Sequence, residues 1–143
     1  MRMLAAALGI LLGALTMSAE AQKPAPKTLT GVQAQKSPQA DVFLAYEEAL
    51  LSKGIDAAGV HMTPERLADM KEQLKQGGEA GFKEFQAKQR ESVAKGEARR
   101  KQIEKVIVDG DTATLEARSS PAFVDEVRMV KTKDGWKIGK GRF

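Results

Sequence analysis

Residues that could do acid–base or metal chemistry are few in this sequence, and they are not grouped. The only histidine, His61, stands in a loop, and there is no cysteine. One histidine cannot supply a serine triad or a multi-histidine metal site, and thiolate chemistry is excluded. Asp109 and Asp111 flank a turn glycine, where aspartate is expected for backbone reasons. We therefore expect no metal ion and no cofactor. We interpret His61 as a solvated loop residue, with a general base as the alternative.

Aromatic side chains offer a second kind of site, an apolar pocket. The chain has five Phe, one Tyr and one Trp, so most of them are expected to be needed for core packing. A pocket remains the alternative use for aromatic groups. The candidate ligand-binding residues on this basis are Phe43, Tyr46, Phe82, Phe85 and Trp136.

The charge balance argues against a nucleic-acid partner. The formal net charge is +4, a modest excess that favours acidic surfaces only weakly. The basic run Arg99, Arg100 and Lys101 follows four further cations, Lys83, Lys88, Arg90 and Lys95. Four acidic residues are interleaved with these cations: Glu84, Glu91, Glu97 and Glu104. We interpret this run as a solvated, ion-paired surface rather than a site for an anionic polymer or lipid surface.

The first 21 residues have the pattern of a secretory signal peptide. Arg2 precedes an apolar stretch, residues 4–15, that is too short to cross a bilayer. Ala19 and Ala21 form an A-x-A cleavage site. We expect cleavage after Ala21, no stable membrane anchor afterwards, and a periplasmic or secreted protein. An uncleaved anchor helix is the alternative.

Three helices are predicted after a flexible tether at residues 22–37, which could instead supply an edge strand through residues 28–32. Ser37-Pro38 is an N-cap followed by a first-turn proline, and predicts a helix of about 15 residues ending near Gly54. Thr63-Pro64 predicts a second helix that ends at Gly77-Gly78. A third helix is expected from Glu79 to about Lys95, with Gly96 as its stop.

Two β-hairpins are predicted after Arg100, where β-branched residues begin to alternate with polar ones. The first turns at residues 109–111, and its register stays open. A three-residue loop places Ile103 and Ile107 on the buried face, and a four-residue loop uses Val106 and Val108 instead. The second turns at residues 133–135, and a three-residue loop there pairs Val130 with Ile138 and Thr132 with Trp136. Helices followed by an antiparallel meander predict an α+β fold, with N-terminal helices on a curved sheet.

The pattern KVIVDGDTATLEA, a polar break and VRMVKTKDGWKI resembles the cone-shaped α+β domains of the nuclear transport factor 2-like superfamily. The helix FLAYEEALLSKGIDA is similar to the first helix of its ketosteroid-isomerase-like and polyketide-cyclase-like members. The resemblance covers about residues 38–140 and is greatest to the exported branch. It implies one domain over residues 38–143, a conical cavity between sheet and helices, and a homodimer packed through the sheet.

The resemblance also suggests which residues would act if the domain were a catalyst. Tyr46 matches the tyrosine that donates to a developing oxyanion in isomerase-like relatives, and Asp69 is the nearest candidate for the proton-shuttling acid. No residue matches the second acidic donor of those relatives. We therefore expect an exported, non-enzymatic domain that holds a small apolar ligand, a peptide or an envelope protein. A weak proton-transfer enzyme using Tyr46 and a nearby carboxylate is the alternative.

Overall fold

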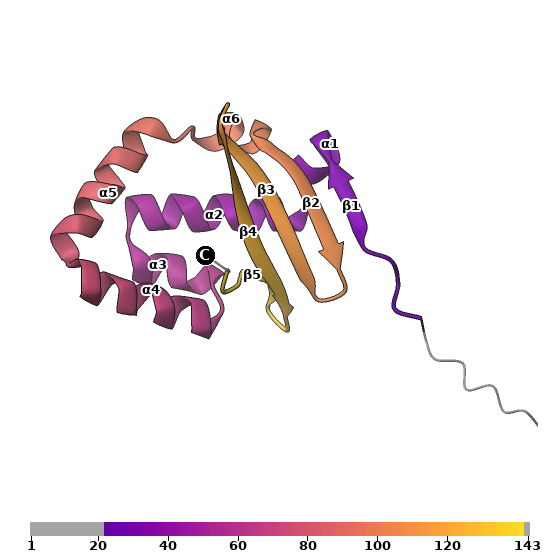
Figure 1. Ribbon diagram of the computed structural model, residues 1–143, viewed down its shortest axis with the longest axis horizontal. Helices are drawn as coiled ribbons and strands as arrows, with labels where there is room; N and C mark the ends of the chain where they lie inside the picture. The colour runs from indigo at the N-terminus through magenta and orange to yellow at the C-terminus, as the bar shows by residue number, and fades with distance from the viewer. Residues whose placement is uncertain (1–21, 142–143) are drawn as a thin grey trace, which may run out of the picture.

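A computed structural model describes residues 22–141 of the chain, so the predicted signal peptide lies outside the described residues. A five-stranded antiparallel sheet has the strand order β1-β2-β3-β4-β5. The helices gather on one of its faces, with α2 crossing behind the strands (Figure 1). The strands are β1 (Lys27–Thr30), β2 (Ile103–Asp109), β3 (Thr112–Ser120), β4 (Phe123–Thr132) and β5 (Gly135–Ile138).

Six α-helices and one 3₁₀ turn occupy most of the chain between β1 and β2 within the described residues. They are α1 (Gly31–Gln35), α2 (Pro38–Ser52), α3 (Ile55–Ala58), η1 (Gly59–His61), α4 (Pro64–Gly77), α5 (Glu79–Ser92) and α6 (Gly96–Lys101). The predicted α+β class, with helices packed on a curved antiparallel sheet, is confirmed.

The two predicted helix starts are formed as expected. Ser37 Oγ accepts a hydrogen bond from the Ala40 amide at 3.2 Å, and Thr63 Oγ1 accepts one from the Arg66 amide at 3.3 Å. Each cap satisfies an amide that would otherwise lack an intrahelical partner. The Thr63 amide also donates to the Ile138 carbonyl at 2.9 Å, which ties the start of α4 to β5.

The core lies between α2 and the inner face of the sheet. The largest fully buried side chains all come from the strands: Ile103, Val106, Leu115 and Met129. Phe43, Tyr46 and Leu50 cover them from α2, at a spacing that places all three on one helix face. The space between sheet and helix, where a cone-shaped domain can hold a cavity, is therefore occupied by packed side chains.

The N-terminal segment is more ordered than a flexible tether. Residues 27–30 form an edge strand that pairs antiparallel with β2, with Leu29 opposite Val106. The alternative of an edge strand is thus the correct one for this part of the segment. The helix α1 that follows was not predicted, and Ala34 on it is fully buried. Regular structure therefore begins at Lys27 rather than at Pro38.

The third predicted helix is divided into two. The helix α5 ends at Ser92, and Val93 has an extended backbone. Gly96 does not stop a helix; it begins α6, with a φ of 57° that a glycine adopts without strain. The chain therefore bends after α5, and α6 returns to contact α2.

Both hairpins have two-residue loops rather than the longer loops expected, so their registers differ from the predicted ones. In the first, Val108 pairs with Ala113 and Val106 with Leu115, so the valine face is the buried one. A bulge between Ile103 and Lys105 then returns Ile103 to the same face, opposite Ala117. In the second, the predicted pairs are wrong by one residue, because Met129 pairs with Ile138 and Lys131 with Trp136.

Candidate functional site

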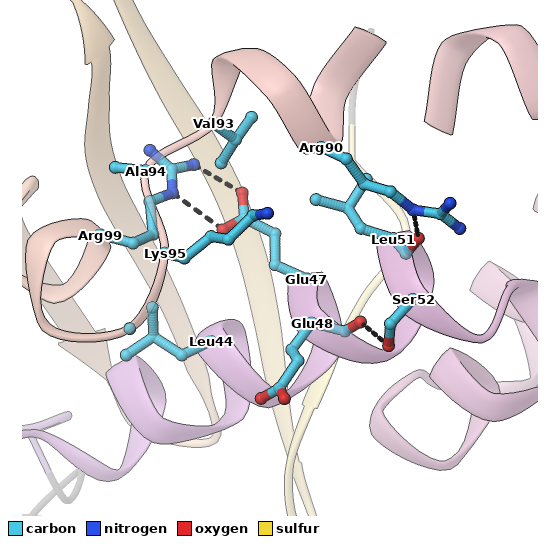
Figure 2. A pocket seen from close by; sticks show the side chains of 11 residues that line it. Leu44, Glu47, Glu48, Leu51, Ser52, Arg90, Val93, Ala94, Lys95 and Arg99 are labelled. Atoms are coloured by element: carbon cyan, nitrogen blue, oxygen red, sulfur yellow. Dashed lines mark hydrogen bonds and ion pairs between the residues drawn. The ribbon is translucent and has the colours of Figure 1, made fainter. Parts of the chain in front are cut away.

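A pocket of about 380 Å³ lies between α2 and the segment that joins α5 to α6 (Figure 2). The aliphatic part of its lining consists of Leu44 and Leu51 from α2 with Val93 and Ala94 from the joining segment. Leu44 and Leu51 are seven residues apart, so they share a helix face next to the one that covers the sheet. The pocket exists because the chain bends at residues 93–96 and faces these leucines.

Arg99 forms one wall of the pocket and is only 3% exposed. Its Nε donates to Glu47 Oε2 at 2.8 Å and its Nη2 to Glu47 Oε1 at 2.6 Å, a bidentate pair between α6 and α2. Further hydrogen bonds reach Asp125 Oδ2 at 3.2 Å and Gln102 Oε1 at 2.9 Å. The guanidinium also lies over the Phe43 ring, 5.2 Å from its centroid.

The hydrogen-bond partners of Arg99 determine its charge state. Burial alone would lower the pKa of Arg99, but the hydrogen bonds and negative charges of Glu47 and Asp125 outweigh burial and raise this pKa. Arg99 therefore stays protonated and neutralises Glu47. The interpretation of residues 99–101 as a solvated surface is wrong for Arg99, whose contact with Glu47 spans 52 residues of sequence.

Arg90 and Gln86 hold the other end of the pocket in place. Arg90 Nε donates to the Leu51 carbonyl, and Gln86 Nε2 donates to the Leu50 carbonyl at 2.7 Å. Both carbonyls belong to the last turn of α2, where carbonyls have no partner inside the helix. Two side chains one turn apart on α5 thus complete the hydrogen bonding at the end of α2.

Lys95 is the remaining cation of the lining. Its side chain makes no hydrogen bond or ion pair with any residue in the range 22–141. Figure 2 shows its side chain extending inward from the joining segment, so that its nitrogen lies among the lining residues. The Glu48 carboxylate points away from Lys95 and Arg90 in the same view.

The five aromatic candidates do not line this pocket. Phe43 and Tyr46 belong to the core, and Trp136 packs partly buried against it from β5. Phe82 and Phe85 stack on α5, with ring centroids 6.3 Å apart, and Phe85 is 47% exposed. Of the five, Phe82 lines a neighbouring pocket of about 320 Å³.

Sequence reasoning missed the aliphatic lining, although one signal for it was present. The helix α2 carries apolar residues on two adjacent faces. Phe43, Tyr46 and Leu50 are buried in the core, whereas Leu44 and Leu51 are only partly buried and line the pocket. A second apolar face predicts a second contact surface. What covers that surface depends on the bend after α5.

Tyr46, Asp69 and His61 are not brought together by any contact among the described residues. The Tyr46 hydroxyl donates to Met70 Sδ at 3.6 Å, and burial raises the pKa of Tyr46 against the opposing effect of Arg66. Asp69 pairs with Lys140 at 3.2 Å. His61 is half-buried in η1, where burial and the charge of Lys137 lower its pKa.

Two further properties concern the part of the chain that the structure describes. Within residues 22–141, no helix combines the length and apolar character needed to span a bilayer. No group of three or more His, Asp or Glu side chains there is arranged to hold a metal ion.

The fold and the pocket define a small α+β domain with a ligand-sized hollow on its helical side. The chain belongs to the family described as "Putative lumazine-binding", whose model matches residues 41–143. This family is related to the nuclear transport factor 2-like proteins, and membership suggests a ligand-binding domain. Comparisons with curated proteins and with solved structures returned no match.

Proposed function

We propose that this protein is an exported, non-enzymatic binding domain, and that it holds a small ligand with an apolar body in the pocket between α2 and α6. The pocket itself carries the proposal. Its volume of about 380 Å³ falls within the range of about 300–1,000 Å³ that is usual for small-molecule sites. Aliphatic side chains line it, and a few polar groups stand at fixed places around them, as such sites require.

The family description supports a ligand of this size. Lumazine is a flat, bicyclic heteroaromatic compound, which is a shape that aliphatic side chains can enclose on both faces. The ligand is placed beside the sheet–helix core rather than inside it, because Ile103, Leu115 and Met129 fill the space between sheet and α2. A peptide or an envelope protein is the alternative occupant.

The test is a fluorescence titration of the purified protein with lumazine and with N-phenylnaphthylamine, a neutral apolar probe. Ala94→Trp places a large ring in the pocket and should weaken binding of both compounds at least roughly tenfold, because overpacked sites reject added volume. Ala122→Trp makes the same change in the exposed turn before β4 and should leave binding unchanged.

Two outcomes would contradict the small-ligand function. Equal affinities for the wild type and Ala94→Trp would place the bound probe outside the pocket. Absence of binding by both compounds, in a protein that co-purifies with an envelope protein, would assign the domain to a protein partner.

Export rests on the pattern of residues 1–21 and has its own test. Mass spectrometry of the protein from a cell that makes it should find a mature chain that begins at Gln22, outside the cytoplasm. An intact chain of 143 residues in the cytoplasm would contradict export.

The alternative function, proton transfer by Tyr46 and a carboxylate, has weaker support. The Tyr46 hydroxyl is directed to the sulfur of the partly buried Met70, and Asp69 is engaged by Lys140.

A further inference from the structure

The charges around the pocket are not balanced within the described residues. Arg99 and Glu47 neutralise each other, and Asp125 also faces Arg99. Arg90 and Lys95 make no ion pair with any described residue. The remaining carboxylate of the lining, that of Glu48, points away from both cations (Figure 2). Two positive charges therefore stand beside an aliphatic surface with no negative partner among residues 22–141.

Arg90 is also held in a fixed orientation. Its Nε is occupied by the Leu51 carbonyl, a neutral acceptor that leaves the charge uncompensated. The two terminal nitrogens make no hydrogen bond within the described residues. A guanidinium that is anchored at one nitrogen and free at two presents a prearranged fork to a planar or tetrahedral anion.

A second hollow adjoins the first at this arginine. The neighbouring pocket of about 320 Å³ shares Ser52 and Arg90 with the first pocket. It adds Lys53 and Lys83, neither of which has an ion pair among the described residues, and one carboxylate, Glu79. Arg90 thus stands between two hollows in which cations outnumber available carboxylates.

Resting on the proposed function, we propose that the natural ligand is an anionic small molecule, with its carboxylate, sulfonate or phosphate held by Arg90 and Lys95. Its apolar body packs against Leu44, Leu51 and Val93. An anion beside an aliphatic wall is screened less than one in open water, so the two cations attract it more strongly than isolated surface lysines would.

The experiment compares two probes that differ by one charged group. Anilinonaphthalene sulfonate and N-phenylnaphthylamine share their aromatic body, and only the first carries a sulfonate. The wild type should bind the sulfonate probe more tightly than the neutral probe. Raising the salt concentration to about 0.5 M should weaken binding of the sulfonate probe alone.

Lys95→Gln is the decisive variant, because Lys95 has no partner within the described residues and its replacement should not disturb folding. It should lower the affinity for the sulfonate probe about threefold to tenfold, as the loss of one partly screened charge predicts, and leave the affinity for the neutral probe unchanged. Lys133→Gln removes the same charge from the exposed β4–β5 turn and should change neither affinity.

The outcomes separate this inference from the proposed function. If the two probes bind equally, and Lys95→Gln affects neither, the anionic ligand is overturned while the pocket keeps its function. If neither probe binds, or Ala94→Trp does not weaken them, the proposed function fails instead. Phosphatidylglycerol vesicles and soluble decanoate distinguish a lipid headgroup from a free anionic ligand. If the vesicles displace anilinonaphthalene sulfonate and decanoate does not, the proposal of a free ligand is wrong and the site binds a lipid headgroup.

Discussion

Arg99 keeps a full positive charge inside the domain because acceptors surround it. Two oxygens of Glu47, one of Asp125 and one of Gln102 receive its N–H groups, and the Phe43 ring lies against its face. A buried charge is tolerated only when it is paired and hydrogen-bonded. The same set of contacts fixes α6 against α2 and so shapes the pocket wall.

Replacing Arg99 should therefore be strongly destabilising. We expect Arg99→Met to lower the free energy of unfolding by about 3–5 kcal/mol, because Glu47 would remain largely buried without a counter-charge. Adding Glu47→Gln should restore part of the loss. Chemical denaturation measures both effects. Arg118→Met, which removes an exposed ion pair with Glu104, is the control and should change stability little. A similar loss for both arginines would contradict this account.

Tyr46 allows a direct test of the catalytic alternative. Its hydroxyl donates a weak hydrogen bond to a sulfur acceptor and also interacts with Arg66, so Tyr46→Phe should lower the free energy of unfolding by about 1–2 kcal/mol. Ligand binding in the pocket should be unchanged. If the wild type has an isomerase-like turnover that the Phe variant loses, the non-enzymatic function is contradicted.

The same variant has a pH signature at the alkaline end. Burial raises the pKa of Tyr46 in the folded protein above its ordinary value of 10.0, so the unfolded chain ionises first as pH rises. The stability contributed by the neutral hydroxyl is complete below pH 10 and is lost as pH increases beyond it. The wild type should therefore lose more stability than Tyr46→Phe above that pH.

At the scale of elements, the bend between α5 and α6 is the feature that creates the site. It requires a positive φ at Gly96, which a residue with a Cβ adopts only at a cost of about 1–2 kcal/mol. No atom lies within 4 Å of the position that a Cβ would take there, so the cost arises from the backbone alone.

A matched pair of glycine variants tests the bend. Gly96→Ala should lower the free energy of unfolding by about 1 kcal/mol. Gly81→Ala, made inside α5 where φ is not positive and no atom is within 4 Å, should raise it by about 0.5 kcal/mol. Thermal unfolding distinguishes the two directions, and equal effects would contradict a left-handed residue at position 96.

On the scale of the whole molecule, the outer face of the sheet is the surface proposed for a homodimer. Side chains alternate between the faces, and Ala113 and Leu115 are buried, so Thr114 and Glu116 point outward. Thr114 lies in the middle of this face, between Ile107 and Arg128 on the neighbouring strands. Lys105 and Glu116 form a cross-strand ion pair there at 2.8 Å.

The mixture of charges predicts how such a dimer would behave. A charged face pairs with itself mainly through electrostatic complementarity, so association should weaken as salt rises. Light scattering at micromolar concentration should find a dimer at low salt, and Thr114→Arg should abolish it. Ser92→Arg, an exposed position at the end of α5, should not. A monomer under all conditions would contradict the proposed homodimer.

Fold class, helix starts and strand positions follow from short-range patterns in the sequence. Ser37-Pro38 and Thr63-Pro64 begin helices because caps act within one turn. The alternation around Leu115 predicts a strand with one buried face. The hairpin registers were harder to predict, because one residue more or less in a turn shifts every pair that follows.

The sequence by itself determined where the helices α2 and α4 begin, which face of β3 is buried and which fold class results. These features depend on residues within a few positions of one another. Only the tertiary structure decided the pocket, because it forms when Arg99 reaches Glu47 across 52 residues and Arg90 reaches Leu51 across 39. Contacts between such distant positions leave no local pattern, so the sequence could group the cations Arg90 and Lys95 but could not place them beside Leu44 and Leu51 in one pocket.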